Sequence, residues 1–270
     1  MSFKNFVDIH NHTKNSYDGH FPIEVMVDAA IEKGIQVVGI TDHVEMDLYK
    51  EKGYDKTIYL SYDETVEAKK IYEGKIEILS GVELGEPTYN LKDSIELIES
   101  RDFDVVIGSI HSLRNWKDFS HYDYKDLDVD AILKEYFQEV KGMVDWGRID
   151  TMAHLTYPLR YIIGNSGIYV DISTYQKDID EIFSLLVEKD IPMEVNASGL
   201  RQTINETFPS APYVRRYKEL GGKYVTFASD AHYPEHMGLH VDEAMKIAKE
   251  CGFNSSLIFR HRQPVEIPIE

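Results

Sequence analysis

Two histidines, one residue apart, follow a short apolar run near the start of the chain. His10 and His12 belong to the stretch 8–12 (DIHNH), directly after Phe6 and Val7. Alternate side chains of a strand point to the same side, so both imidazoles can face one point. Imidazole is the most common metal-binding side chain near neutral pH. The pair therefore predicts two nitrogen ligands for one metal ion if further ligands join it; an ordinary polar turn is the alternative.

Further metal-binding side chains follow most of the apolar runs of the chain. With the first pair, the candidate ligands are His10, His12, Asp18, His43, Glu83, His111, His154, Asp230 and His232. Nine ligands are too many for one ion, whereas three ions with shared ligands would use them, with Glu83 as a bridge. Mixed imidazole and carboxylate ligands suit zinc, and also iron(II) or manganese. The alternative is that these are buried, hydrogen-bonded histidines without a metal. That interpretation would have to explain why six histidines lie at equivalent positions after the apolar runs.

The segments that must position these residues alternate between two patterns. Predicted strands lie at 5–10, 35–41, 76–82, 104–110, 149–154, 191–196 and 223–228. Their nearly continuous apolar character suits parallel strands covered on both faces. Predicted helices lie at 22–34, 61–73, 129–145, 178–188, 211–220 and 240–250, the second beginning at a capping box of Ser61 and Glu64. This alternation predicts an α/β fold, and seven strands favour a barrel, whose catalytic face lies at the C-terminal strand ends.

Composition limits the expected number of domains, the kind of partner and the cellular location. The 270 residues are 43% hydrophobic, which suits one domain over residues 1–270. A net charge of -18, without a Lys/Arg run, predicts no nucleic-acid partner. No apolar run of about eighteen residues predicts a membrane span. Residues 1–5 lack the apolar stretch of a signal peptide, and the single Cys251 excludes an internal disulfide framework, so we expect a cytoplasmic protein.

Two arginines and one insertion are candidates for substrate contact. Arg160 and Arg201 follow the fifth and sixth predicted strands, and guanidinium groups bind phosphate oxygens in a bidentate manner. A salt bridge to a nearby carboxylate is the alternative for each. The polar, aromatic-rich stretch 112–128 is either an active-site wall or an ordinary surface loop. The remaining histidines are expected on the surface, including a pair with helical spacing: His20, His121, His236, His240 and His261.

Six motifs in this order resemble the polymerase and histidinol phosphatase (PHP) superfamily. They are 8–12 (DIHNH), 41–43 (TDH), 81–83 (GVE), 108–111 (GSIH), 153–154 (AH) and 229–232 (SDAH). The resemblance implies a distorted (β/α)7 TIM-like barrel with three divalent ions at the C-terminal strand ends. It implies a first ion on His10, His12, Glu83 and Asp230, a second on Glu83, His111 and His154, and a third on Asp18, His43 and His232. Some members have histidine where this chain has Asp18, which can still ligate. Asp8 lies outside this ligand set and is expected to be a supporting or buried polar group.

Within the superfamily the chain is similar to stand-alone histidinol-phosphate phosphatases. Its length, residues 112–114 (SLR) and residues 196–201 (NASGLR) carry that similarity. It implies hydrolysis of L-histidinol phosphate, a small metabolite of histidine biosynthesis, by a hydroxide that bridges two metal ions. Glu83, Asp230 and His232 would be catalytic, with Asp230 or His232 protonating the leaving alkoxide, and Arg160 and Arg201 would bind phosphate. The alternatives are another small phosphomonoester such as phosphotyrosine or a nucleotide, a phosphodiesterase or nuclease activity, and a metal-binding module without catalysis.

Overall fold

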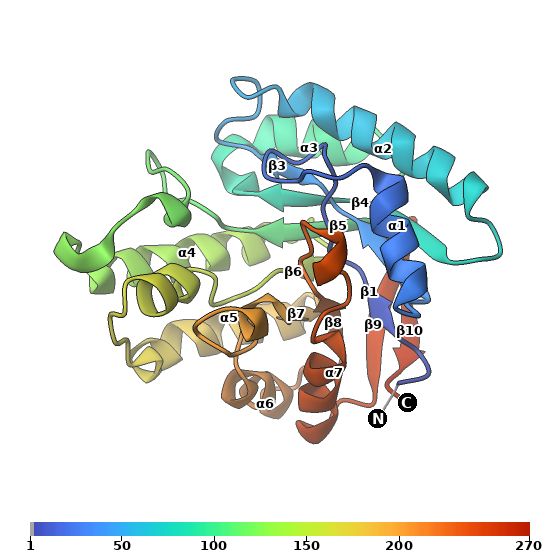
Figure 1. The fold of residues 1–270 in the computed structure, drawn as a ribbon. Helices are drawn as coiled ribbons and strands as arrows, with labels where there is room; N and C mark the ends of the chain where they lie inside the picture. The colour runs from blue at the N-terminus through green and yellow to red at the C-terminus, as the bar shows by residue number, and fades with distance from the viewer. Residues whose placement is uncertain (1–2) are drawn as a thin grey trace.

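A mostly parallel β-sheet forms the centre of the fold in the computed structural model, which describes residues 3–270 (Figure 1). Residues 1 and 2 of the predicted domain lie outside the described residues. The strands are β1 (Val7–Asp8), β2 (Val37–Ile40), β3 (His43–Glu45), β4 (Glu77–Gly85), β5 (Val105–Ser109), β6 (Thr151–Met152), β7 (Met193–Asn196), β8 (Val225–Ala228), β9 (Ser255–Arg260) and β10 (Gln263–Pro268). The sheet order is β1-β2-β4-β5-β6-β7-β8-β9-β10, with β3 paired to β4. All of these pairs are parallel except β9–β10, so the α/β prediction is confirmed.

Helices surround the sheet, as Figure 1 shows. They are α1 (Ile23–Glu32), α2 (Tyr54–Ile71), α3 (Leu91–Glu99), α4 (Val129–Trp146), α5 (Gln176–Glu188), α6 (Ala211–Glu219) and α7 (Val241–Glu250). Every residue of β2, β5, β7 and β8 is buried, as expected for parallel strands covered on both faces. Across residues 3–270, no helix is both long and apolar enough to cross a membrane.

The closed seven-stranded barrel is not confirmed. In the described chain, β1 and β8 are not joined by a continuous ladder. The segments meet instead through the Ile9 N–H bonded to the Phe227 carbonyl at 3.1 Å and through an isolated bridge between Asn11 and Ala231. Asp230 has a φ of 55°, so the chain leaves the extended conformation just after β8. Backbone hydrogen bonds continue past this turn, from the Asp230 N–H to the His10 carbonyl at 3.0 Å and from the His12 N–H to the Ala231 carbonyl at 2.9 Å, but they do not form one regular ladder.

One predicted helix boundary is wrong, and one hairpin was not predicted, both for local reasons. Helix α2 begins at Tyr54, after Gly53 in the left-handed region, and not at the expected cap Ser61. Ser61 lies buried inside the helix, where its hydroxyl donates to Asp42. The β9–β10 hairpin turns at His261 and Arg262, which both have positive φ values, although glycine and asparagine are the usual residues of such turns. The usual turn signal is therefore missing from the sequence.

Candidate metal centre

The nine predicted ligands converge at the C-terminal edge of the parallel strands. His10 and His12 follow β1, His43 begins β3, Glu83 lies in β4, and the others follow β5, β6 and β8 or lie in the loop before α1. Nitrogen-to-oxygen separations of 3.0–3.7 Å link all nine into one connected cluster: His10, His12, Asp18, His43, Glu83, His111, His154, Asp230 and His232. The structure therefore brings together every ligand that the sequence predicts.

Glu83 lies at the middle of this cluster. Five imidazoles come within 3.5 Å of its carboxylate oxygens: those of His10, His12, His43, His111 and His154. Burial alone would raise the pKa of Glu83, but the surrounding imidazoles, His10 first among them, hold it well below its usual range. The central group is therefore a carboxylate with two oxygens facing different histidines, as a bridging ligand requires.

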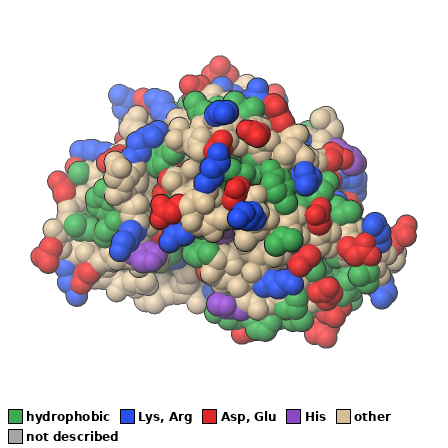
Figure 2. Space-filling view, turned by 90° about the horizontal axis from the view of Figure 1, so that it is seen from above, with side chains coloured by type: hydrophobic (Ala, Val, Ile, Leu, Met, Phe, Trp, Pro, Cys, Tyr) green, Lys and Arg blue, Asp and Glu red, His purple; other side chains and the backbone are tan. Residues whose placement is uncertain are grey.

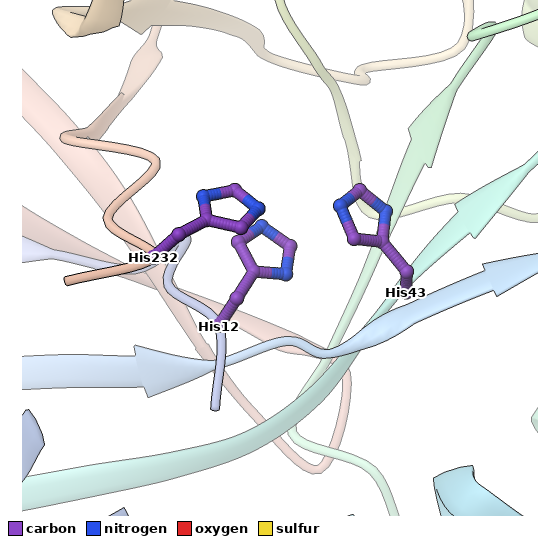
Figure 3. A group of neighbouring side chains, drawn as sticks. All are labelled: His12, His43 and His232. Carbon is purple, nitrogen blue, oxygen red and sulfur yellow. The ribbon is translucent and has the colours of Figure 1, made fainter. Parts of the chain in front are cut away.

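Several atoms of the cluster are buried and make no hydrogen bond, although they lie 3.0–3.7 Å from other members of the cluster. They are His10 Nε2, His12 Nε2, Asp18 Oδ1, His43 Nδ1, Glu83 Oε2 and His232 Nε2. Buried polar atoms are almost always paired, so six neighbouring exceptions need an explanation. Figure 3 shows His12, His43 and His232 from three segments of the chain, and one ligand nitrogen from each lies within 4.8 Å of the other two. The donor set of imidazole and carboxylate fits divalent metal ions such as zinc.

Within the nine-residue cluster, two other groups of donor atoms meet the same 4.8 Å limit: His10, His12 and Glu83, and His43, Glu83 and His111. His12, His43 and Glu83 are each shared between two of the three groups. This sharing differs from the ligand sets that the family resemblance implies, in which His12 belongs to the first ion alone and His43 to the third. Shared donors are compatible with more than one ion in a small volume.

The second nitrogen of several histidines is held by a neighbouring group. His10 Nδ1 lies 2.8 Å from Glu194 Oε2, and His111 Nδ1 lies 3.1 Å from Glu45 Oε1. His232 Nδ1 lies 3.1 Å from the Asp230 carbonyl. Because these oxygens accept a hydrogen bond from the Nδ1–H group, the Nε2 lone pair of each ring is directed into the cluster. Carboxylates and carbonyls behind metal-binding histidines commonly fix the ring in this way.

Three acidic residues of this region were missed by the sequence predictions. Glu194 lies in β7 between the apolar residues Met193 and Val195. An acidic residue inside an apolar strand is unusual, and this pattern could have identified Glu194 from the sequence. Glu45 lies two residues after His43 in β3, so the strand period placed it on the same side as that histidine. Glu86 follows β4 with a φ of 47°, and the sequence carries no comparable signal for it.

Asp8 supports the turn that carries Asp230, which agrees with its expected place outside the ligand set. Its carboxylate accepts hydrogen bonds from the Ser229 N–H at 2.9 Å, from the Ser229 hydroxyl, and from the Gly238 N–H at 3.0 Å. Burial raises the pKa of Asp8 even against these hydrogen bonds. Asp8 therefore fixes the backbone next to Asp230 and Ser229 rather than reaching the cluster itself.

The two predicted phosphate-binding arginines occupy different positions. Arg160 begins a short π-helix (Arg160–Asn165) and lines a cavity of about 230 Å³ over the histidine cluster. It lies 3.3 Å from Asp230 Oδ2, and its buried Nε has no hydrogen-bond partner. Arg201 donates instead to the carbonyls of Ser229 and Asp230 and is not among the residues that line this cavity. Arg160 is therefore the better placed of the two to meet a ligand.

The insertion 112–128 forms part of a cavity wall. Ser112, Trp116, Lys117, Asp118 and His121 line a second cavity beside the cluster. His121 is exposed, as are His20 and His261. The pair His236 and His240 does not share a helix face, because His236 ends a short 3-10 helix (Pro234–His236) and His240 precedes α7 with a φ of 64°. The expected helical spacing of that pair is therefore wrong.

Comparison with known proteins places this architecture in context. The PHP domain family matches residues 8–198. A probable histidinol-phosphatase of Clostridium acetobutylicum is 32% identical over 250 residues, which cover 90% of this chain and 93% of that protein. The histidinol-phosphatase of Lactococcus lactis is 26% identical over 264 residues, covering 94% of each.

A crystal structure of histidinol phosphate phosphatase from Lactococcus lactis has a similar fold. That protein is complexed with zinc, L-histidinol and phosphate, and superposes with a TM-score of 0.82 at 22% identity. The match covers 97% of this chain and 99% of that one.

Proposed function

Since this chain belongs to the PHP domain family, we propose that it is a metal-dependent phosphomonoesterase that hydrolyses L-histidinol phosphate to L-histidinol and phosphate. The observation that carries the proposal is the set of six buried, unpartnered ligand atoms at the C-terminal strand edge. Relatives of nearly the same length carry that activity in their names, and histidine biosynthesis follows from it.

The proposed resident group is a set of three divalent ions, with zinc favoured and iron or manganese as alternatives. The residues that would hold them are His10, His12, Asp18, His43, Glu83, His111, His154, Asp230 and His232. Divalent ions bound there supply an activated water and neutralise charge on a transferring phosphoryl group. Glu83 is proposed as the shared ligand because five histidines surround it.

Residues of the chain would then position the phosphate and protonate the leaving alkoxide. Arg160 lines the cavity over the cluster with an unpartnered Nε, so it is proposed to donate to a phosphate oxygen. Arg201 is proposed to act by holding the Ser229–Asp230 backbone, in addition to its predicted phosphate contact. Asp230 and His232 both line the cavity, and the proton for the leaving alkoxide is proposed to come from one of them.

We also propose that residues 1–270 form one domain with a distorted, incompletely closed barrel. The Lys4 N–H donates to the Glu270 carbonyl, and Figure 1 shows the first and last segments of the described residues 3–270 side by side. One hydrophobic core cluster extends from Val7 to Ile269. On the face drawn in Figure 2, acidic and basic side chains are interspersed, which suits a small substrate better than a nucleic-acid track. The cytoplasmic location stays a prediction.

A substrate panel tests the proposed function. We would measure kcat/KM for L-histidinol phosphate, phosphotyrosine, a nucleoside monophosphate and a short oligonucleotide with metal-reconstituted protein. We expect L-histidinol phosphate to be preferred by at least about tenfold. A preference for either other monoester would keep the phosphatase chemistry but change the substrate. Cleavage of the oligonucleotide alone would overturn the proposal.

A further inference from the structure

A second and larger cavity lies beside the metal centre. Its volume is about 800 Å³, compared with about 230 Å³ for the cavity over the cluster. Tyr17, His111 and Asp118 line both cavities, so the two spaces share a wall. The larger space has the size of a small-molecule site and adjoins the place proposed for the phosphate.

Two buried acidic residues, Glu45 and Glu86, line this larger cavity. Glu86 is fully buried, and its Oε1 accepts hydrogen bonds from the backbone N–H groups of His111 and Ser112. Its other oxygen, Oε2, is buried without a hydrogen-bond partner in the described chain. Thr57 Oγ1, which belongs to another residue lining the cavity, is also buried and unpartnered. Unpaired polar atoms in one cavity indicate a ligand group that completes their hydrogen bonds.

The charges of the cavity favour a cationic ligand group. An oxygen of Glu45, an oxygen of Glu86 and a nitrogen of His111 lie within 4.8 Å of one another. Two carboxyl groups this close repel each other unless a proton or a cation lies between them. The lysines that line the same cavity, Lys14, Lys52 and Lys117, are exposed to solvent, whereas both glutamates are buried.

The walls favour a flat organic cation over a metal ion. The rings of Tyr17, Tyr54 and Trp116 line the cavity. Aromatic rings attract cations and also pack against flat groups. A single metal ion would leave most of a space of about 800 Å³ unfilled.

We propose that Glu45 and Glu86 receive the positively charged organic end of the substrate, an ammonium or imidazolium group, while its phosphate lies over the metal centre. This inference rests on the proposed function and deepens it. It makes Glu86 a residue that determines specificity for cationic phosphomonoesters. Trp116 and Tyr54 supply the apolar walls of the same subsite.

The test compares two substrates in Glu86→Gln. L-histidinol phosphate carries the cationic groups, and 3-phenylpropyl phosphate has a ring on a three-carbon chain but no positive charge. The glutamine carbonyl can still accept from the His111 and Ser112 N–H groups. We expect kcat/KM for L-histidinol phosphate to fall about 30-fold more than kcat/KM for 3-phenylpropyl phosphate. Glu67→Gln, which removes an exposed carboxylate on α2, is the matched control and should change neither value.

Three other results of this experiment would contradict either the subsite or the proposed function. An equal change for both substrates in Glu86→Gln would overturn the subsite while leaving the phosphatase activity in place. Loss of one metal equivalent per chain in that variant, measured by metal analysis, would assign the pair to a metal ion and also overturn it. A wild-type protein that hydrolyses L-histidinol phosphate no better than 3-phenylpropyl phosphate would contradict the proposed function itself.

A second variant keeps the inference testable if Glu86→Gln does not fold. Thr57→Val removes the other unpartnered atom of the cavity without removing a charge. We expect kcat/KM for L-histidinol phosphate to fall about fivefold, with a smaller change for 3-phenylpropyl phosphate. An unchanged ratio between the two substrates in Thr57→Val would contradict the subsite.

Discussion

Carboxylates are buried at both ends of the parallel strands, but their hydrogen bonding differs. Asp104 and Asp150 at the amino ends are fully hydrogen-bonded, whereas Glu83 at the carboxyl ends is not. At the amino ends of β5 and β6, Asp104 accepts from Lys69 Nζ, from the Ser80 N–H at 2.8 Å and from the His261 N–H at 3.1 Å. Asp150 is paired there with Arg262 at 2.9 Å. At the opposite edge, Glu83 Oε2 and the nitrogens around it have no hydrogen-bond partner in the described chain.

This difference separates a structural role from a ligand-binding role. A buried carboxylate whose hydrogen bonds are complete stabilises the fold, and its removal leaves donors unpaired. A buried cluster whose donors and acceptors are incomplete has a free-energy cost that a bound cation can relieve. The amino edge is therefore expected to control stability, and the carboxyl edge to control metal binding and turnover.

Glu83→Gln should have the largest effect on activity. It removes the charge that five histidines surround, so we expect kcat/KM for L-histidinol phosphate to fall by about 10³-fold or more and metal content to decrease. Steady-state kinetics and metal analysis of the purified variant would measure both. Glu99→Gln, an exposed carboxylate at the end of α3, is the control. Activity within tenfold of wild type would show that Glu83 is not a metal ligand.

Glu194→Gln should weaken metal binding by about 10–100-fold without removing a ligand. Its carboxylate lies 2.8 Å from His10 Nδ1, so the glutamine changes the hydrogen bond that orients the ring. Competition with a chelator of known affinity would report the loss, and excess metal should restore most of the turnover. Unchanged metal affinity would indicate that Glu194 only fills space behind His10.

Arg160→Ala should act mainly on phosphate recognition. We expect KM for L-histidinol phosphate to rise about 30-fold while metal content stays constant, because Arg160 contacts the cluster through Asp230 only. Inhibition by inorganic phosphate should weaken in parallel. A variant with reduced kcat and normal KM would instead assign Arg160 to the chemical step.

Asp104→Asn should lower stability and leave turnover within about twofold of wild type. The loss of its charge-assisted hydrogen bonds should reduce the free energy of unfolding by about 1–3 kcal/mol at pH 7. Urea denaturation would measure this change. A large loss of activity in a folded variant would break the proposed division between the two edges.

The contribution of Asp104 should also depend on pH. Burial would raise its pKa, but the hydrogen bond from Lys69 and those from Ser80 and His261 lower it below the usual value. Because the folded-state pKa is lowered, the stabilisation is complete above the unfolded value of about 4 and disappears as pH falls through the folded value. The stability difference between wild type and Asp104→Asn should therefore shrink below about pH 4. A difference that grows on acidification would contradict this sign.

The sequence predicted the residues of the metal cluster better than the neighbouring residues that hold them in place. His10 and His12 could be found because strand periodicity and ligand type act within a few residues. Glu194, in contrast, meets His10 across 184 positions of the chain, and only the fold shows that contact. Glu86 also depends on a backbone turn with positive φ that no glycine marks.

The fold shows the same limit. Parallel strands such as β5 and β7 were predicted because their apolar runs are continuous. The short strand β3 was hidden because its residues are mostly polar, His43-Val44-Glu45, although all three are buried. Barrel closure depends on how the ends of β1 and β8 meet at Asp230, which is a property of packing and not of periodicity.

Titration of Zn²⁺ into chelator-stripped protein, with kcat/KM for L-histidinol phosphate as the readout, tests the central claim most directly. The unpartnered ligand atoms predict that the stripped protein is inactive and that activity rises by about 10³-fold or more as metal is added. Stripped protein that retains full activity, with metal analysis confirming its removal, would contradict the assignment of this cluster as a catalytic metal centre.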